Sequence, residues 1–545
     1  AGITFDDVRI IVRNSYVLPV AKLEERLAYR DFRSYLTRLE RTRAAKHPLF
    51  QSSDPRIVDI SHHLAHAYSA FAVSPFESGA VMIVDGVGSY CRDVCEPMPA
   101  GSEASPLARE SESYYSFDGT ALQPLKKVWL EPAPGFLSDE FFMMQGLGAL
   151  YSRVSSYIFK SWNKCGEVMG LSAYGRRGAI SPLARVKDQN LGDQELKVPE
   201  WTAARNQPFL GGGDEAWEDS PNRPHWEDLS RQLQDDTEEV LLARARWLHD
   251  KTGAKNLCLA GGVALNCVAN GRIVREGPFE HVWIQPAAGD DGIAIGCAYY
   301  GQLAVASEPR SFIMRHAYLG KRYGKSDEDD ALHPPLVRAF TRHRQHTDIA
   351  SATAEQLAAG KIVGWFQGAS EFGPRALGNR SILADPSDPG MKDHLNARVK
   401  HRQDFRPFAP AILAERLADV FECNTPSPFM LLSANVKPEW RARLPAITHV
   451  DGSARIQTVD PETNPEFYAL LKAFEARTGI PVLINTSFNI RGEPIVETPQ
   501  HAVNCFIGTD IDTLVLGQTM VEKRWTYPLA RPLLKFADRV RAHVP

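Results

Sequence analysis

The sequence has no apolar run of the roughly 18 residues that a membrane-spanning helix needs. It also has no recognisable signal peptide, no C-x-x-C pair among its eight cysteines and no large excess of charge of one sign. Scattered single cysteines favour a reducing compartment over a disulfide framework. Together these absences predict a cytoplasmic protein that does not bind membranes.

Charge and composition narrow the class of protein further. The 62 lysines and arginines are balanced by 66 acidic residues, so the net charge is −4 and wholesale nucleic-acid binding is not expected. Hydrophobic residues make up 43% of the 545 positions, as in ordinary globular proteins. At about 150 residues per domain, this length predicts two to four domains, each with a sizeable core.

A repeated pattern of strand, glycine-rich turn and helix predicts an α/β fold. It occurs at residues 79–89, 256–273 and 281–301. In the second segment we expect a strand over 256–260 before the Gly261-Gly262 turn. In the third, the strand is expected to end at Gly289 and a helix to begin near Gly292. Strand ends of this kind often face a ligand in α/β domains.

A second α/β domain is predicted in the last third of the chain. The polar stretch 320–335 ends in two prolines, which is typical of a linker. Strands are expected beyond it at 360–368, 479–489 and 511–517. We therefore predict an N-terminal domain over residues 1–340 and a C-terminal domain over 341–545.

Two variable regions are expected to lie on the surface of the N-terminal domain. Residues 176–236 are interpreted as an insertion, and the stretch 211–230 is rich in glycine, proline and acidic residues. A helix is predicted to start at Asp236, with Glu239 completing a capping box. The second region is a predicted loop over 91–140. Loops carry specificity, so we expect contacts with a substrate in both regions.

The heptapeptide SHHLAHA, residues 61–67, has two readings. If it is helical, His62 and His66 are four residues apart and share one face, the spacing with which two imidazoles bind one divalent cation. Alternatively it is a polar helix start with Ser61 as N-cap. The adjacent carboxylates Asp290 and Asp291 follow a strand; Asp290 is a candidate third ligand, and Asp291 a candidate helix cap.

The glycine-rich turns are candidate anion sites. Backbone N–H groups of Gly261 and Gly262 in AGGVALN open a helix and could cradle a phosphate, with Asn266 adding a side-chain donor or acceptor. Tight packing between strand and helix explains the same glycines. Asp85, in VDGVGS, could hold a metal-bound water, bind a nucleotide hydroxyl or cap its turn.

A basic cluster lies in the predicted C-terminal domain. Between residues 375 and 406, seven basic residues stand among prolines and glycines: Arg375, Arg380, Lys392, Arg398, Lys400, Arg402 and Arg406. Guanidinium forks suit the geometry of phosphate, and lysine adds a point charge. INTSFN contributes Asn485, Thr486 and Ser487 as neutral donors. The alternative is ordinary surface charge.

These motifs in this order resemble the nodulation and cephamycin family of O-carbamoyltransferases. The resemblance runs from about residue 55 to about residue 520 and includes HHLAHA, VDGVGS, GEVMGLSAYG, AGGVALN, PAAGDDG, FGPRALGNRSILADP, VKHRQDFRPFAP and INTSFN. It implies an α/β protein with an N-terminal actin/sugar-kinase-like domain, related to tRNA threonylcarbamoyltransferases. It implies a C-terminal threonylcarbamoyl-adenylate-synthase-like (YrdC-like) α/β domain.

The resemblance also implies a reaction in two stages. Carbamoyl phosphate and the co-substrate ATP give carbamoyl-adenylate, with release of phosphate and pyrophosphate. The carbamoyl group then passes to the hydroxyl of a small-molecule acceptor such as an antibiotic scaffold, and AMP leaves. A divalent metal, with Fe²⁺ expected, serves the transfer, and Mg²⁺ is a further candidate beside ATP. A homodimer is also in keeping with the family.

Site residues follow from the resemblance by position. It implies that a metal is bound by His62, His66 and Asp290. It implies that the nucleotide is held by Gly261, Gly262, Val263, Asn266 and Glu167. It implies that carbamoyl phosphate is held by the catalytic residues Arg375, Lys400 and Arg406, in a basic pocket that Arg455 and Ser487 complete. Asn485 and Ser487 are also expected among the cofactor-binding residues.

One departure and two alternatives accompany the resemblance. Family members begin with a strand and an HD-containing turn, which the opening AGITFDDVRIIVRNSY does not match; we expect that part to be missing from this sequence, and no acceptor base can be named. A tRNA threonylcarbamoylation enzyme with fused domains is the first alternative; it would need a basic tRNA-facing surface, and the sequence pI of about 6.5 and the acidic insertion at 211–240 disfavour it. An actin-like sugar kinase is the second, and it leaves the basic cluster unexplained.

Overall fold

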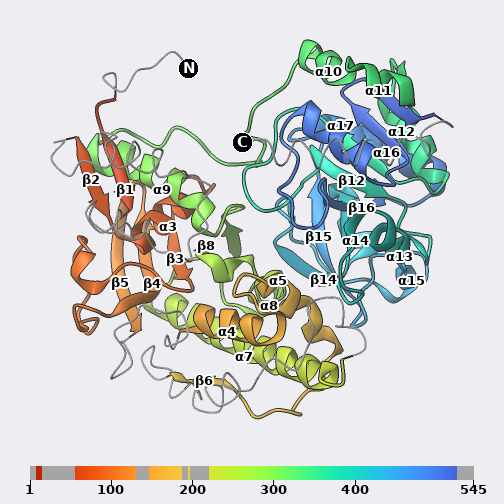
Figure 1. Ribbon diagram of the computed structural model, residues 1–545. Coiled ribbons are helices and arrows are strands. Elements are labelled where there is room, and N and C mark those ends of the chain that lie inside the picture. The colour runs from red at the N-terminus through yellow and green to blue at the C-terminus, as the bar shows by residue number, and fades with distance from the viewer. Residues whose placement is uncertain (1–7, 15–55, 131–145, 187–193, 197–219, 525–545) are drawn as a thin grey trace.

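The computed structural model describes residues 8–14, 56–130, 146–186, 194–196 and 220–524 (Figure 1). Two large sheets lie on either side of residue 340, each flanked by helices, so the predicted α/β class is confirmed. The finer resemblance of the two parts to actin-like and YrdC-like domains stays a prediction. Within the described ranges, no helix combines the length and apolar character needed to cross a membrane.

The first large sheet has five strands in the order β5-β4-β3-β8-β9. The strands are β3 (Ser78–Val84), β4 (Arg109–Asp118), β5 (Ala121–Leu130), β8 (Asn256–Ala260) and β9 (His281–Ile284). Strands β3, β8 and β9 run parallel, and β4 and β5 run antiparallel to their neighbours. The predicted loop over 91–140 is therefore wrong over β4 and β5, which form a hairpin whose first strand pairs with β3.

Helices pack on this sheet from the same stretch of chain. They are α3 (His62–Phe71), α4 (Leu147–Phe159), α5 (Cys165–Leu171), α7 (Arg223–Thr252), α8 (Cys267–Glu276) and α9 (Ile293–Tyr300). Helix α3 contacts β3, β4 and β8, and it packs along α9. Two small ladders complete this part: β1 (Ile11–Asn14) with β2 (Ile57–Ile60), and β6 (Ala184–Val186) with β7 (Gln194–Leu196).

Helix α7 begins thirteen residues earlier than predicted. It starts at Arg223, and Pro224 occupies its first turn, where a proline costs no hydrogen bond. Asp236, the predicted cap, lies inside the helix, and its Oδ2 atom accepts hydrogen bonds from the backbone N–H groups of Leu183 and Ala184 at 2.6 and 3.0 Å. Of the predicted loop 211–230, residues 211–219 lie outside the described residues.

Strand β9 ends at Ile284, five residues before the predicted end. Pro286 follows closely and has no N–H group to continue the ladder. A short 3-10 turn, Asp290–Gly292, then leads into α9. Gly292 is the N-cap of α9, and no side chain caps that helix start, so the alternative of an Asp291 cap is not supported.

The second large sheet has nine strands in the order β10-β18-β17-β11-β12-β16-β13-β15-β14. Their bounds are β10 Thr341–Gln345, β11 Val363–Phe366, β12 Arg380–Ala384, β13 Ala409–Leu413, β14 Leu432–Asn435, β15 Ser453–Val459, β16 Val482–Ser487, β17 Thr513–Leu516 and β18 Thr519–Lys523. Strands β11, β16 and β17 lie inside the three predicted strand segments. The sheet is mixed: β11 pairs with β17 and β13 with β15 in parallel, and the other pairs are antiparallel.

The helices of this part are mostly short. They are α10 (Lys325–Leu332), α11 (Pro335–Phe340), α12 (Ile349–Ala358), α13 (Met391–Leu395), α14 (Leu417–Val420), α15 (Pro438–Arg441), α16 (Pro465–Thr478) and α17 (Pro499–Gly508). The predicted linker 320–335 is wrong over α10, which packs against α17. The Asp327 carboxylate accepts from the Gly324 N–H at 2.8 Å and so caps this helix start.

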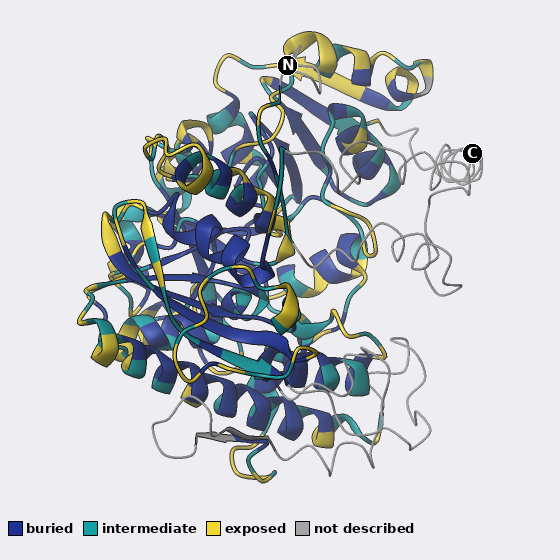
Figure 2. Cartoon of the chain, turned by 90° about the vertical axis from the view of Figure 1, so that its left-hand side faces the viewer, coloured by how far each residue is buried: buried dark blue, intermediate teal, exposed yellow. Residues whose placement is uncertain are grey.

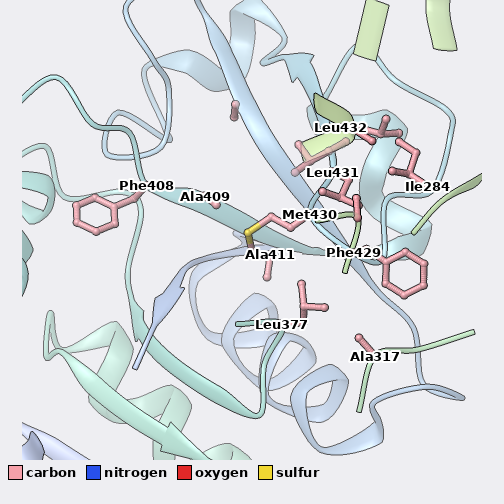
Figure 3. Packing of buried hydrophobic residues seen from close by; sticks show 14 of the residues in the cluster. Ile284, Ala317, Leu377, Phe408, Ala409, Ala411, Phe429, Met430, Leu431 and Leu432 are labelled. Atoms are coloured by element: carbon pink, nitrogen blue, oxygen red, sulfur yellow. The ribbon is translucent and has the colours of Figure 1, made fainter. Parts of the chain in front are cut away.

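The two parts share a packed boundary. Figure 2 shows that the central strands of the sheets are buried, whereas exposed residues gather on outer helices, loops and edge strands such as β10. In Figure 3, Ile284 of β9 lies beside Leu431 and Leu432. Helix α8 packs on β14, and the Asn270 side chain donates to the Leu431 carbonyl at 3.1 Å. A Cβ atom at Gly271 would lie 2.4 Å from the Ser433 carbonyl oxygen, so only glycine permits this approach.

Candidate functional site

The first site lies at the start of α3. Ser61 is the N-cap, and its hydroxyl accepts from the Leu64 N–H at 3.2 Å, so the predicted cap and helix are both present. One helical turn separates His62 from His66, and their Nε2 atoms are 3.2 Å apart. Both histidines are buried. The polar helix start and the paired imidazoles therefore coexist in one segment.

Two carboxylates converge on these imidazoles. The Oδ2 atom of Asp85, just after β3, lies 3.0 Å from His62 Nε2 and 3.8 Å from His66 Nε2. The Oδ1 atom of Asp290 lies 3.4 and 3.8 Å from the same nitrogens. The structure thus brings the three predicted ligands together and adds Asp85. The sequence indicated for Asp85 a metal-bound water, a nucleotide hydroxyl or a turn cap, but not a place among the ligands.

The charge states of the histidines and aspartates in this cluster depend on one another. Burial alone would lower the pKa of His62, but the Asp290 and Asp85 carboxylates raise it to about 10. Burial would raise the pKa of Asp85, yet hydrogen bonding to His62 keeps it well below its usual range. Hydrogen bonds to the two histidines likewise lower the pKa of Asp290. The cluster therefore needs a positive charge at its centre, from a proton or a cation.

The donor set fits a divalent cation. One ligand atom from each of His62, His66, Asp85 and Asp290 lies within 4.8 Å of all the others. The 3.2 Å separation of the two nitrogens suits two imidazoles that share one ion at about 2.0–2.1 Å. Three of the residues are buried, while the Asp290 side chain is 73% exposed. A centre that opens to one side is the arrangement of a catalytic site.

Close packing of α9 against α3 places Asp290 beside the two histidines. A Cβ atom at Gly296 of α9 would lie 1.7 Å from the Ala65 carbonyl oxygen of α3. At Gly292 it would lie 2.0 Å from the Ala287 carbonyl oxygen. Both positions therefore need glycine for α9 and its preceding turn to lie against α3.

A buried ionic network supports α3 from beneath. The Lys127 ammonium group lies 2.5 Å from a Glu110 oxygen and 2.7 Å from a Glu96 oxygen. Glu110 also accepts from the backbone N–H groups of His63 and Ser89, at 3.2 and 3.0 Å. Ser89 in turn accepts from the His62 N–H at 2.9 Å. Sequence reasoning missed this network, because only strand pairing shows that Glu110 and Lys127 are buried.

The AGGVALN turn is held by local packing. Gly261 has φ +88°, and a Cβ atom there would lie 2.3 Å from the Val84 carbonyl oxygen. The Gly262 N–H donates to Asp85 Oδ1 at 2.9 Å, so this turn also fixes a residue of the candidate metal cluster formed by His62, His66, Asp85 and Asp290. Asn266 caps α8 through the Ala269 N–H. Val263 is half-buried in the same turn.

The second site is a cavity of about 170 Å³ at the boundary between the two parts. Residues of α5, α7 and α8 line one side of it. The other side carries four arginines, one aspartate and the INTSFN segment, and its charged, imidazole and amide residues are Arg375, Arg402, Arg406, His449, Asp451, Arg455 and Asn485. Three of these arginines belong to the predicted basic cluster, while Arg380 does not reach the cavity: it lies in β12 and donates to backbone carbonyls such as that of Gln367.

Two of the cavity's arginines lack an acceptor. The Nε atoms of Arg375 and Arg455 are buried and have no hydrogen-bond partner among the described residues. Burial lowers the pKa of both groups, and the Arg455 charge adds to the effect at Arg375. The buried Oδ1 atom of Asn485 is also without a donor there. Buried polar atoms without partners mark a place for a ligand.

Lys400 lies beside the same wall. It ends a short π-helical turn, Asn396–Lys400, and the chain reverses at His401, which has φ +46°. The Lys400 ammonium group donates to Asn489 Oδ1 at 2.8 Å and to Ser487 Oγ at 3.2 Å. Its burial lowers its pKa well below the usual range. The predicted proximity of Lys400 and Ser487 is therefore present in the structure.

Glu167 lies on the opposite wall from most of these groups. It belongs to α5, and its Oε1 atom accepts from Arg406 Nη1 at 2.9 Å. The structure thus pairs a residue predicted to hold nucleotide with one predicted to hold carbamoyl phosphate. It brings Arg375, Arg402, Arg406 and Arg455 together in the lining of one cavity, whereas Lys400 lies behind that lining against Ser487. His62, His66 and Asp290 come together in another place, which Gly262 joins through Asp85.

Family models cover most of the chain. A model described as the carbamoyltransferase N-terminus matches residues 26–299, and one described as the carbamoyltransferase C-terminus matches residues 354–523. Together the two models span the metal cluster and the cavity arginines.

Curated relatives align over long stretches. An uncharacterized protein of Synechocystis is 40% identical over 505 residues, which are 86% of this chain and 77% of that protein. Nodulation protein NolO of Bradyrhizobium diazoefficiens is 35% identical over 503 residues, which are 89% of this chain and 84% of that protein. A solved structure of HypF from T. kodakarensis aligns with 49% of this chain and 39% of that chain, at 15% identity and a TM-score of 0.28; similarity at that level supports no conclusion.

Proposed function

This chain belongs to the carbamoyltransferase family, and on that premise we propose that it is an ATP-dependent O-carbamoyltransferase with two separate sites. The cavity at the boundary forms carbamoyl-adenylate from carbamoyl phosphate and ATP. The His62–Asp290 cluster serves the transfer of the carbamoyl group to the hydroxyl of a small-molecule acceptor. An antibiotic or similar secondary metabolite is the acceptor class that we propose.

One observation carries the first part of this proposal. Arg375 and Arg455 present buried guanidinium nitrogens without an acceptor to a cavity that Arg402 and Arg406 also line. Guanidinium groups bind phosphate oxygens in a planar, bidentate way and keep their charge when buried. A cavity with four such groups therefore suits a phosphate-bearing substrate, and carbamoyl phosphate is the small phosphate that the family's reaction requires.

The first stage consists of a hydrolysis and an adenylation. Water cleaves carbamoyl phosphate to carbamate and phosphate, and the arginines stabilise the charge of the departing phosphate. A carbamate oxygen then attacks the α-phosphorus of ATP, pyrophosphate leaves, and carbamoyl-adenylate forms. Lys400 lies buried between Ser487 and Asn489, so we propose that it positions the reacting phosphate or carbamate group. Mg²⁺ is proposed to accompany ATP.

The second stage uses the metal cluster. His62, His66, Asp85 and Asp290 would hold the ion, which we propose is Fe²⁺, since imidazole and carboxylate suit iron among other metals. When bound, the ion supplies Lewis-acid stabilisation of charge on the leaving phosphate group. The acceptor hydroxyl displaces AMP at the carbamoyl carbon and loses its proton. We propose that the glycine turn Gly261–Asn266 lies beside the nucleotide, because it joins the cluster through Gly262.

The products of the first stage test this function. Carbamoyl phosphate plus ATP, without acceptor, should release both phosphate and pyrophosphate, and Lys400→Ala should abolish the pyrophosphate. Lys472→Ala, a half-exposed lysine on α16, is the matched control and should behave as the unaltered chain. Release that needs threonine and bicarbonate in place of carbamoyl phosphate would assign the chain to the tRNA-modifying class. Unchanged release by Lys400→Ala would refute the proposed site.

A further inference from the structure

A short loop of the C-terminal part joins the cavity to the N-terminal part. Residues 401–408 carry Arg402 and Arg406 into the cavity wall. The same loop makes two ion pairs across the boundary: Arg406 with Glu167 of α5 at 2.9 Å, and Asp404 with Arg223 of α7 at 3.1 Å. The Arg406–Glu167 pair uses an arginine of the cavity wall, whereas the Asp404–Arg223 pair does not.

Glu167 faces more than its direct partner. Burial and neighbouring arginines lower the pKa of Arg375 and of Arg402, and the Glu167 carboxylate acts in the opposite direction on both. Its side chain is only 15% exposed, so its charge is poorly screened by water. Glu167 therefore supplies negative charge to a group of arginines that otherwise repel one another.

We propose that Glu167 is an internal competitor of the phosphate ligand: its carboxylate occupies Arg406 until a phosphate dianion enters the cavity and displaces it. This inference rests on the proposed function, because it assumes that the cavity binds phosphate. A carboxylate and a phosphate oxygen are alternative acceptors for the same guanidinium fork. The dianion outcompetes the monoanion because it carries more charge and, inside the cavity, lies among Arg375, Arg402 and Arg455 as well as Arg406.

Displacement has a consequence at the boundary. Release of Glu167 leaves Asp404–Arg223 as the remaining one of the two ion pairs that this loop makes with α5 and α7. Helix α5 lies close to the loop, since a Cβ atom at Gly170 would be 3.6 Å from Pro407 Cδ. Ligand binding in the cavity therefore changes the contacts of helix α5 directly. This helix belongs to the N-terminal part, which also contains the proposed metal cluster.

The sign of an affinity change tests the proposal. Inorganic phosphate is titrated into the full chain by calorimetry at fixed low ionic strength, and Glu167→Gln is compared with the unaltered protein. The substitution keeps the shape of the side chain and removes its charge. We expect the Kd for phosphate to fall by roughly threefold to tenfold, which is the scale of a partly exposed ion pair. An unchanged or higher Kd would overturn the proposal, because Glu167 would then merely hold Arg406 in place.

Two further variants complete the design. Asp404→Asn removes the other boundary carboxylate and should leave the Kd unchanged; a matching fall would show that loosening of the boundary, not competition, causes the effect. In an Arg406→Ala background, Glu167→Gln should have a smaller effect than alone, because its direct partner is gone. Circular dichroism confirms that each variant is folded, and Glu167→Asp, which keeps the charge, should retain a Kd close to that of the unaltered chain.

The failure of this inference and that of the proposed function are distinguishable. If the unaltered chain binds phosphate and Arg406→Ala weakens the binding, the cavity is a phosphate site whatever Glu167 does. If the unaltered chain does not bind phosphate at millimolar concentration, the proposed phosphate site is wrong. The proposed competition by Glu167 is then wrong as well.

Discussion

The imidazoles of His62 and His66 face each other across 3.2 Å, Nε2 to Nε2, in the buried first turns of α3. Two such nitrogens in contact are stable only if a proton or a cation lies between them and the surrounding carboxylates. Asp85 and Asp290 supply the compensating negative charge. This relationship is the basis for several tests that need no knowledge of the acceptor.

Asp85 is expected to be a metal ligand. Asp85→Asn keeps the size of the side chain but removes the charge, so the metal content after purification with iron(II) should fall well below that of the unaltered chain. Asp93→Asn, at a half-exposed position in a nearby short turn, is the control and should retain full metal content. Elemental analysis measures both, and full occupancy in Asp85→Asn would refute this ligand.

Gly296 is expected to be essential for the geometry of the cluster. In Gly296→Ala the new methyl group meets the Ala65 carbonyl at 1.7 Å, so α9 must move away from α3 and carry Asp290 with it. We expect a loss of about 1–3 kcal/mol in the free energy of unfolding, typical of an overpacked site, together with a loss of metal. Gly508→Ala meets nothing within 4 Å and should be close to neutral in both denaturant unfolding and metal analysis.

Glu110 touches no ligand atom, so we expect it to affect metal binding by positioning the start of α3. Glu110→Gln weakens the tie between Lys127 and the start of α3, and metal affinity should fall by roughly tenfold to a hundredfold, as for other residues that orient metal ligands. Glu112→Gln on the same strand breaks a comparable buried pair with Arg244. Both variants should unfold more easily, but only Glu110→Gln should bind metal more weakly in a competition with a chelator.

Metal binding is expected to release a proton at pH 7.5. Burial opposes the charge on His62, but Asp290 and Asp85 raise its pKa to about 10, so the metal-free protein carries a proton there that the ion must displace. In the metal-free protein, the stabilisation from this raised pKa is complete below pH 6.5 and is lost as the pH rises through about 10. Calorimetry in buffers of different ionisation enthalpy measures the number of protons released for each ion bound. Binding without net proton release would contradict the charged state of His62.

The candidate ligands His62, His66 and Asp290 could be named from the sequence because the signal for each is local. The i, i+4 spacing places His62 and His66 on one helical face, and Asp290 follows a strand before a glycine. Asp85 could not be assigned among its candidate roles, because its place depends on β3 lying parallel to β8 and on the Gly262 turn. In the structure Asp85 contacts His62 with one oxygen and accepts from the Gly262 N–H with the other, and neither contact was among the roles considered for it.

Long-range pairing explains what the sequence could not predict. The alternating acidic residues of β4 were interpreted as part of a loop, because Glu110 and Glu112 are buried only once β4 lies between β3 and β5. The start of α7 was misplaced because Pro224 favours both loops and first helical turns. The pairing of Glu167 with Arg406 could not be predicted, since nothing local shows that α5 faces a residue 239 positions further along the chain.

The most direct test of the account is the exchange of labelled pyrophosphate into ATP without acceptor. Reversible formation of carbamoyl-adenylate predicts exchange that requires carbamoyl phosphate or the carbamate derived from it. The exchange should disappear in Lys400→Ala and persist in Asp85→Asn, because the cavity and the metal cluster are separate sites. Exchange that needs no carbamoyl donor, or that survives in Lys400→Ala, would contradict the central claim.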